Sequence, residues 1–273
     1  MTGGGPLRVM VKISGEALAS GSSGVFSDAA ISSVVKEILK LQETGAEVAC
    51  VVGGGNIFRG SVSSDWNIER VEADNVGMLG TIANGILLRA KIEATSDIEV
   101  RLMSALTIPQ IGEPYIRRRA TRHLEKNRIV LLCGGIGEPY LTTDYPSVQR
   151  AIELDCDCVL AMKNGIDGVY DSDPRKNEDA RLYKSLTFEK AIKDRLTFMD
   201  QAALVLAQQH SMRVHVVGFD QSGAAGRVLN GEQIQDLDLS TSPLKDRPAR
   251  GYISFQDEAK RIWYRNVRIK ELD

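Results

Sequence analysis

The chain has 273 residues, and its 34 lysines and arginines nearly balance 36 aspartates and glutamates, which gives a formal net charge of −2. With 43% apolar and 26% charged residues, it has the composition of a globular protein with a substantial core, arranged as one large domain or two lobes. Its apolar stretches fall far short of the roughly 20 residues of a membrane-spanning helix, and residues 1–6 lack the apolar core of a secretory signal. These features exclude an integral membrane protein and predict a cytoplasmic location.

The first fifty residues predict a strand, a helix and a second strand. Residues 7–13 form a short apolar run, which is typical of a buried strand. From Asp28 onward, apolar residues recur at helical spacing until Gly45, a residue suited to a helix terminus. Residues 46–52 are again apolar and lead directly into the sequence Gly53-Gly54-Gly55-Asn56.

The same alternation continues along the chain. We expect helices at residues 75–94 and 115–126 and strands at residues 99–103, 128–133, 158–162 and 214–217. Strands that are apolar throughout and alternate with helices predict an α/β fold with a mostly parallel sheet covered by helices on both faces.

Glycine-rich or polar loops follow four of the expected strands. They are residues 12–15, 53–60, 134–137 and 163–165. Ligands of open α/β sheets bind beyond the carboxyl ends of the strands, and glycine lets backbone amides approach an anion closely. The loops therefore indicate a polyphosphate site, although a triple glycine alone is equally compatible with a simple turn. The P-loop and the dinucleotide-binding glycine motifs are absent.

Taken in order, these segments resemble the bacterial uridylate (UMP) kinases of the amino-acid kinase family. The resemblance covers roughly residues 8 to 234, and its order and spacing are more specific than any single piece. The segments that carry it are 9–17, 53–60, 70–79, 109–119, 142–144, 167–174 and 199–200. The resemblance implies a three-layer αβα sandwich that transfers the γ-phosphoryl group of ATP to UMP, with Mg²⁺ as cofactor, in a homo-oligomer that is usually a hexamer.

The resemblance also assigns catalytic roles. Lys12 resembles the lysine that neutralises the transferring phosphoryl group, and Arg59 the arginine that clamps the phosphates, for which its planar fork is well shaped. Asp144 and Asp200 match acidic positions that orient the lysine and hydrated magnesium, so no metal site built from protein ligands alone is expected. A solvated lysine and a surface arginine ion pair are the plain alternatives.

Binding residues follow in the same way. The positions that resemble the ATP site are Lys12, Ser14, Gly15, Gly55, Arg59, Asn164, Tyr170 and Asp173. The positions that resemble the UMP site are Gly54, Asp74, Ile136, Gly137, Glu138, Thr142 and Thr143. Asp74 matches the ribose-binding carboxylate, with a helix N-cap as its alternative, and Tyr170 is alternatively a core residue.

Two departures from the family pattern concern the acceptor loop and the carboxyl terminus. The family sequence G-T-G-N-P is replaced by Gly135-Ile136-Gly137-Glu138-Pro139, which removes a hydroxyl and exchanges an amide for a carboxylate that only accepts hydrogen bonds. We therefore hypothesise an altered acceptor preference.

Beyond the kinase-like domain of residues 7–234, we expect a linker at 235–250 and a β-hairpin tail at 251–273, which resembles the end of a 3-keto-disaccharide hydrolase β-sandwich domain.

Other functions remain as alternatives at this point. The chain could be a carboxylate or carbamate kinase of the same fold, or a nucleotide-binding assembly protein without turnover. The basic residues between Arg117 and Lys126 suggest nucleic-acid binding, but the overall charge and the lack of interleaved aromatic residues argue against it.

The four cysteines have no C-x-x-C spacing, which predicts buried free thiols rather than disulfides or zinc ligands.

Overall fold

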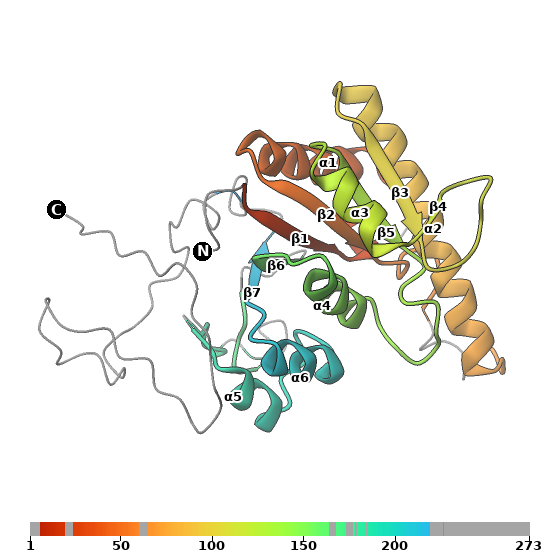
Figure 1. Ribbon diagram of the computed structural model, residues 1–273. Helices are drawn as coiled ribbons and strands as arrows, with labels where there is room; N and C mark the ends of the chain where they lie inside the picture. Colours follow the sequence, from red (N-terminus) through yellow and green to blue (C-terminus); the bar gives the residue numbers. More distant parts are fainter. Residues whose placement is uncertain are drawn as a thin grey trace, which may run out of the picture.

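The computed structural model of the protein describes residues 6–19, 24–59, 65–163, 168–172, 177, 179–183, 185–218 and 226. Within these residues, parallel strands form a seven-stranded sheet in the order β4-β3-β5-β2-β1-β6-β7 (Figure 1). The strands are β1 (Arg8–Ile13), β2 (Glu47–Val52), β3 (Val100–Ser104), β4 (Glu113–Pro114), β5 (Ile129–Cys133), β6 (Cys158–Lys163) and β7 (Val214–Gly218).

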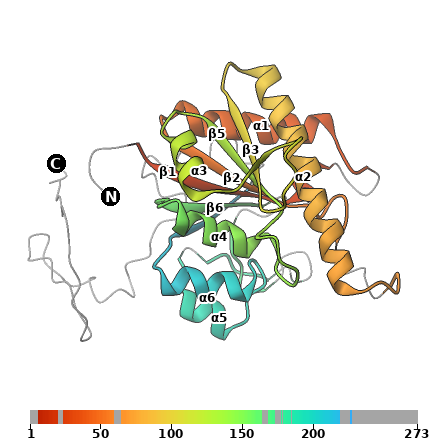
Figure 2. The same ribbon diagram turned by 45° about the vertical axis from the view of Figure 1, so that its right-hand side comes forward.

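Helices cover both faces of this sheet, as Figures 1 and 2 show. The helices are α1 (Asp28–Glu43), α2 (Arg70–Thr95), α3 (Arg117–Leu124), α4 (Asp144–Glu153), α5 (Phe188–Lys193) and α6 (Gln201–Gln209), with a 3-10 turn η1 (Gly15–Leu18) after β1. Apolar residues of α1 and α2 pack on one face, and those of α3, α4, α5 and α6 pack on the other. The expected αβα sandwich is confirmed.

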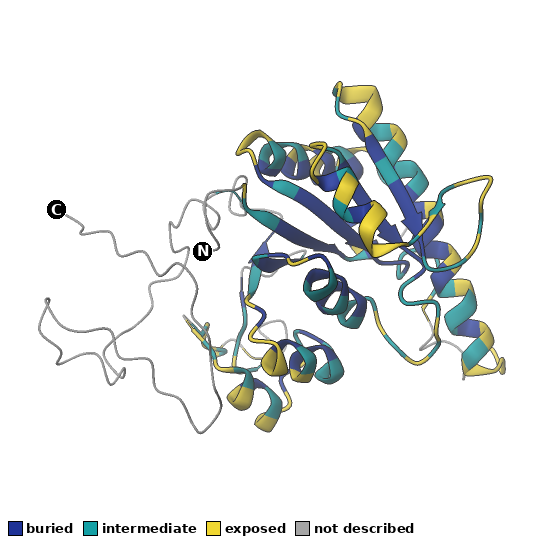
Figure 3. Cartoon of the chain, viewed as in Figure 1, coloured by how far each residue is buried: buried dark blue, intermediate teal, exposed yellow. Residues whose placement is uncertain are grey.

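The alternation of side chains along β1 decides which of them point toward helix α4. Successive side chains of a strand point to opposite faces of its sheet. Val9, Val11 and Ile13 belong to the core with α1 and α2, whereas Met10 belongs to the core with α4. Figure 3 shows that the strands are largely buried, and Lys12 is also buried, with 6% of its surface exposed. Lys12 shares the face of Met10 and therefore points toward α4.

Two helices begin at other residues than the sequence pattern predicts. Helix α2 begins at Arg70, with Glu69 as its N-cap, so Asp74 lies in its second turn and is not a cap. An Arg70–Asp74 ion pair with i,i+4 spacing accompanies this earlier start. Helix α3 begins at Arg117 because the N–H of Tyr115 donates to the carbonyl of Ser104 at the edge of the sheet.

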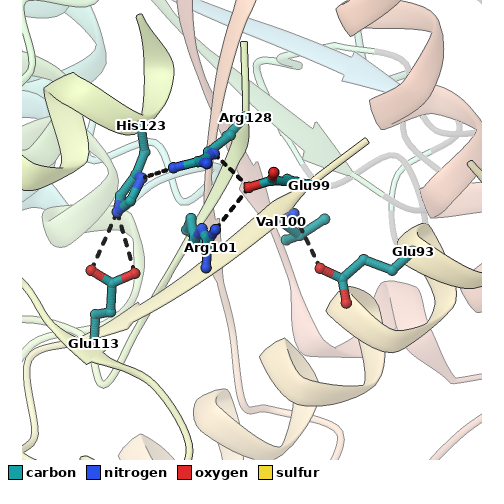
Figure 4. Close-up of polar contacts among 7 residues, drawn as sticks. All are labelled: Glu93, Glu99, Val100, Arg101, Glu113, His123 and Arg128. Carbon is teal, nitrogen blue, oxygen red and sulfur yellow. Dashed lines mark hydrogen bonds and ion pairs between the residues drawn. The ribbon is translucent and has the colours of Figure 1, made fainter. Parts of the chain in front are cut away.

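Charged side chains fasten the β3–β4 edge of the sheet to α3 (Figure 4). Glu99 accepts from both Arg101 and Arg128, at 2.7 and 2.6 Å. A nitrogen of Arg128 lies 3.1 Å from Nδ1 of His123, whose Nε2 lies 3.2 Å from Glu113. Because arginine only donates, His123 Nδ1 accepts and its Nε2 carries the proton toward Glu113.

Other sequence predictions concern the thiols, the membrane and the carboxyl terminus. All four cysteines are buried and free, as expected. In the described part of the chain, no helix is both long and apolar enough to cross a membrane. The predicted linker at 235–250 and the hairpin at 251–273 lie outside the described residues.

Candidate active site

The candidate site lies beyond the carboxyl ends of β1, β2 and β5, where parallel strands of an open α/β sheet commonly present ligand-binding loops. The 3-10 turn η1 follows β1, and the glycine loop at 53–55 follows β2. The N–H of Gly53 donates to the carbonyl of Ile13 at 2.8 Å, which holds the two loops side by side.

A buried ion pair lies at the end of β1. Lys12 Nζ is 2.8 Å from Oδ1 of Asp144, the first residue of α4. The backbone N–H of Asp200, the N-cap of α6, donates to the other oxygen of Asp144 at 3.1 Å. Asp200 in turn accepts a hydrogen bond from the hydroxyl of Thr142 at 3.1 Å. Residues far apart in the sequence thereby form one charged cluster.

Lys163, the last residue of β6, adds a second positive charge to this cluster. Lys12 pairs with Ala161 in the parallel register, so Lys163 lies two residues further along β6 and on the same face of the sheet. Burial lowers the pKa of Lys163, the charge of Lys12 lowers it further, and Asp144 opposes the change. Burial alone would raise the pKa of Asp144, but Lys12 and Lys163 and its hydrogen bonds hold that pKa below its ordinary value.

The glycine loop fits tightly because its residues lack side chains. A Cβ on Gly54 would lie 2.4 Å from the carbonyl oxygen of Gly77 in α2, and a Cβ on Gly15 would lie 2.6 Å from the nitrogen of Gly55. Gly54 is buried. No residue of the described part of the chain accepts a hydrogen bond from the N–H of Gly54 or Gly55. Buried unpaired N–H groups are rare in proteins, so the N–H of Gly54 indicates a site for an anion, and the N–H of the half-buried Gly55 lies next to it in the same loop.

A cleft of about 380 Å³ opens beside the glycine loop. Arg59 and Glu16 lie at its wall and form an ion pair, with 54% and 55% of their side-chain surfaces exposed. The Nε of Arg59 also donates to the carbonyl of Gly55 at 3.3 Å. A solvent-exposed ion pair contributes little stability, so a phosphate group can displace Glu16 from Arg59 at small cost.

Asp74 lies in the wall of the cleft and joins two segments. Its carboxylate accepts from Nε of Arg70 at 2.8 and 2.9 Å and from the backbone N–H of Tyr140 at 2.9 Å. Tyr140 has a positive φ of 68°, which is unusual for a bulky residue. The contact with Asp74 holds the loop after β5 against the beginning of α2.

The structure brings most of the sequence-predicted residues to this region. The cleft is lined in part by Gly54, Gly55, Arg59, Asp74, Ile136, Glu138, Thr142 and Thr143. Lys12, Asp144 and Asp200 form the adjoining cluster, Ser14 is the N-cap of the neighbouring turn η1, and Gly15 is the first residue of that turn. Gly137 belongs to the same loop as Ile136 but does not line the cleft.

Three residues predicted for the ATP site, Asn164, Tyr170 and Asp173, are less completely described. Tyr170 is half-buried and forms an isolated antiparallel bridge with Leu182. Asn164 and Asp173 lie outside the described residues.

Sequence reasoning missed several residues that shape the site. Lys163 lies in the predicted loop at residues 163–165, but the resemblance assigns it no role. Thr81 accepts a hydrogen bond from the N–H of Gly134 at 2.6 Å, and Asn84 donates to the carbonyl of Gly53 at 2.6 Å. Both are polar residues on the buried face of α2. A polar residue within an apolar helical stripe was the signal that could have identified them.

Comparisons with known proteins agree with this geometry. Residues 8–218 match the sequence model of the amino acid kinase family. A protein of Frankia casuarinae named uridylate kinase is 48% identical over 238 residues, which covers 87% of this chain and 92% of that protein. A uridylate kinase of Bifidobacterium adolescentis is 42% identical over 85% of this chain and 93% of its own length. The crystal structure of a UMP kinase from Bacillus anthracis superimposes with a TM-score of 0.81 at 44% identity, over 84% of this chain and 94% of that one.

Proposed function

The chain belongs to the amino acid kinase family, and on that premise we propose that it is a UMP kinase, which transfers the γ-phosphoryl group of ATP to UMP and yields UDP and ADP. The uridylate kinases and the UMP kinase structure to which it is similar span nearly its whole described fold. This similarity favours UMP over the carboxylate and carbamate acceptors of other members of the fold class.

The observation that carries the proposal is the pair of unpartnered N–H groups of Gly54 and Gly55 beside a cleft that also contains a guanidinium. Within the described residues these donors have no acceptor. Arg59 reaches the same cleft, and its partner Glu16 is exposed and exchangeable. Phosphoryl transfer depends mainly on positioning and on positive charge around the migrating group, and both are available here.

We assign the catalytic roles as follows. A phosphate oxygen of UMP attacks the γ-phosphorus of ATP, and the bond from that phosphorus to the β,γ-bridging oxygen breaks, so ADP leaves without a phosphoenzyme. Lys12 neutralises the charge on the transferring group, and Arg59 clamps the phosphates of donor and acceptor. Asp144 and Asp200 orient Lys12 through the contacts described above. Asp74 accepts hydrogen bonds from the ribose hydroxyls of UMP.

Magnesium is the proposed cofactor, and the site offers two carboxylates, Asp144 and Asp200, that could bind a hydrated Mg²⁺ ion. Asp144 and Asp200 are adjacent, but among the described residues no three His, Cys, Asp or Glu side chains are grouped so as to hold a metal ion. Mg²⁺ typically keeps several waters and binds one or two carboxylates together with nucleotide phosphates. Asp144 and Asp200 would hold the hydrated ion, which would supply positive charge at the phosphates.

The loop at residues 135–139, which departs from the family sequence, carries the observation that favours a second candidate function. Ile136 and Glu138 both line the cleft. A carboxylate at position 138 can accept from N3–H of uracil, but it can equally accept from the exocyclic amino group of cytosine. We therefore include a UMP kinase with weakened acceptor discrimination as the alternative, and a nucleotide-binding protein without turnover as a further one.

The wider setting is also proposed from the resemblance. We propose a cytoplasmic enzyme of pyrimidine nucleotide biosynthesis that assembles as a homohexamer, with residues 7–234 as the kinase domain. Residues 235–250 and 251–273 remain a proposed linker and hairpin tail.

An acceptor screen tests the proposed function. ADP release with ATP and Mg²⁺ is followed in a coupled assay with UMP, CMP, dUMP and, separately, simple carboxylates. We expect UMP-dependent ADP release. Equal rates with UMP and CMP would support a weakened preference between acceptor bases. ADP release with a carboxylate alone would identify the protein as a carboxylate kinase of the same fold. No ADP release with any acceptor would support a nucleotide-binding protein without turnover.

A further inference from the structure

Asn84 is a polar side chain enclosed completely within the protein, with 0% of its surface exposed, on the face of α2 that packs against the sheet. Its amide nitrogen donates to the carbonyl of Gly53 at 2.6 Å and to Oδ1 of Asn56 at 2.7 Å. The amide of Asn56 returns a bond to Asn84 at 3.2 Å and donates to the carbonyl of Val25 at 2.8 Å. The two asparagines therefore join α2, the glycine loop and the segment before α1.

The bond from Asn84 to Gly53 also fixes the orientation of the next N–H group. The carbonyl of Gly53 and the N–H of Gly54 belong to one planar peptide unit, in which a trans geometry points them in opposite directions. Because the carbonyl points toward Asn84, the N–H of Gly54 points away from that side chain. Gly54 lines the cleft, and its N–H has no acceptor within the described part of the chain.

Within the described residues, Asn84 is the only hydrogen-bond partner of the peptide unit between Gly53 and Gly54, whereas the neighbouring peptides are held by backbone bonds from Gly53 to Ile13 and from Ile57 and Phe58 to the carbonyl of Gly54. Gly53, Gly54 and Gly55 carry no side chains, and glycine peptides rotate more freely than any others. Gly54 also passes so close to α2 that a Cβ would lie 2.4 Å from the carbonyl of Gly77, so a bulkier, stiffer residue does not fit. If the peptide between Gly53 and Gly54 turned over, a carbonyl oxygen would face the phosphate and repel it.

We propose that Asn84 is a positioning residue for the acceptor phosphate, which it orients through Gly53 so that the N–H of Gly54 donates to a phosphate oxygen of UMP. This inference rests on the proposed function, because it takes UMP as the ligand of the cleft. Asn84 itself is buried behind the loop and lines no part of the cleft. Its influence on binding is therefore specific to the phosphate and absent for the rest of the nucleotide.

Comparison of UMP with uridine tests this specificity. Asn84→Ala removes the anchor, and we expect it to weaken UMP binding about tenfold, the effect of losing roughly one well-formed hydrogen bond to a charged group. Uridine, measured as a competitive inhibitor at millimolar concentration, lacks the phosphate and should bind both proteins equally. The matched control is Thr95→Val, which removes a hydroxyl that bonds only within its own helix, to Lys91 and Ile92. It should change neither affinity.

The outcomes separate this inference from the proposed function. Parallel losses of UMP and uridine affinity in Asn84→Ala would show a merely structural role and overturn the inference. Failure of the wild-type protein to bind UMP would overturn the proposed function and the inference with it. If Asn84→Ala does not fold, a crystal structure of the wild-type protein with UMP decides: we expect the Gly54 nitrogen within hydrogen-bond distance of a phosphate oxygen, and a phosphate that makes no contact with this N–H would overturn the inference.

Discussion

The ammonium nitrogen of Lys12 lies 2.8 Å from a carboxylate oxygen of Asp144, and both side chains are largely buried. The pair joins the end of β1 to the first residue of α4, where the helix dipole also favours a negative charge. Removing one member of a buried ion pair leaves an uncompensated charge, whereas removing both does not. The pair therefore provides a means of separating catalytic effects from effects on stability.

Loss of the second cation at this site should slow turnover. Lys163→Met keeps the length of the side chain but removes the charge that lies beside Lys12 and Asp144. We expect kcat to fall about 10- to 100-fold, the range for a lost hydrogen bond to a charged group, with little change in the KM for UMP. Steady-state kinetics at saturating ATP measure it, with Lys193→Met on α5 as the control. An unchanged kcat would show that Lys163 takes no part in phosphoryl transfer.

The guanidinium of Arg59 should not be replaceable by an ammonium. Arg59→Lys keeps the positive charge and loses the planar fork that binds two phosphate oxygens together. We expect kcat/KM for UMP to fall by about tenfold or more. The control Arg122→Lys changes an exposed arginine of α3 and should leave the kinetics as they are. If Arg59→Lys were fully active, Arg59 would be only the surface partner of Glu16.

Acceptor preference should respond to position 138. Glu138→Asn restores an amide that can both donate and accept, which a carboxylate cannot do. We expect the ratio of kcat/KM for UMP to that for CMP to rise in this variant, by as much as a factor of about 10⁴ if the wild-type protein has lost a buried match. The ratio is measured with both acceptors in the same coupled assay. A high UMP preference in the wild-type protein that Glu138→Asn leaves unaltered would refute the role of Glu138.

The low pKa of Asp144 predicts how stability depends on pH. Since the folded-state pKa lies below the ordinary value of about 3.9, the contribution of the carboxylate is fully present above that value and is lost as the pH falls through the folded-state pKa. The free energy of unfolding should therefore decrease more steeply below about pH 4 in the wild-type protein than in the Lys12→Met/Asp144→Asn double variant. Urea denaturation at several pH values measures both. Parallel curves would show that this pair contributes nothing to the acid response.

Six of the seven strands were predictable from the sequence because they form short apolar runs, whereas the two-residue edge strand β4 (Glu113–Pro114) is not apolar and was not predicted. The strand at residues 46–52 and the loop that follows it appear in the structure nearly as expected. The beginning of α2 was not predictable in the same way. Asp74 is a residue type that commonly caps helices, which suggested a later start, and its ion pair with Arg70 was recognised only in the structure.

The residues of the candidate site were also predictable only in part. The motifs indicated residues that line the cleft in the structure, such as Gly54 and Arg59, because phosphate binding requires particular residue types. They did not indicate Asn84, because its role arises from a contact 31 positions away along the chain. Neither did they give a role to Lys163, whose position beside Lys12 depends on the register between β1 and β6.

Transfer of labelled phosphate from ATP is the most direct measurement of the proposed mechanism. With γ-³²P-labelled ATP, Mg²⁺ and UMP, we expect the label to appear in UDP, and we expect Lys12→Met to lower that rate about 10²- to 10³-fold, as the loss of one transition-state contact typically does. Urea denaturation of Lys12→Met, beside the double variant with Asp144→Asn, shows whether lost folding accounts for the lower rate. Label released only as inorganic phosphate, or a folded Lys12→Met protein within about tenfold of the wild-type rate, would contradict the mechanism.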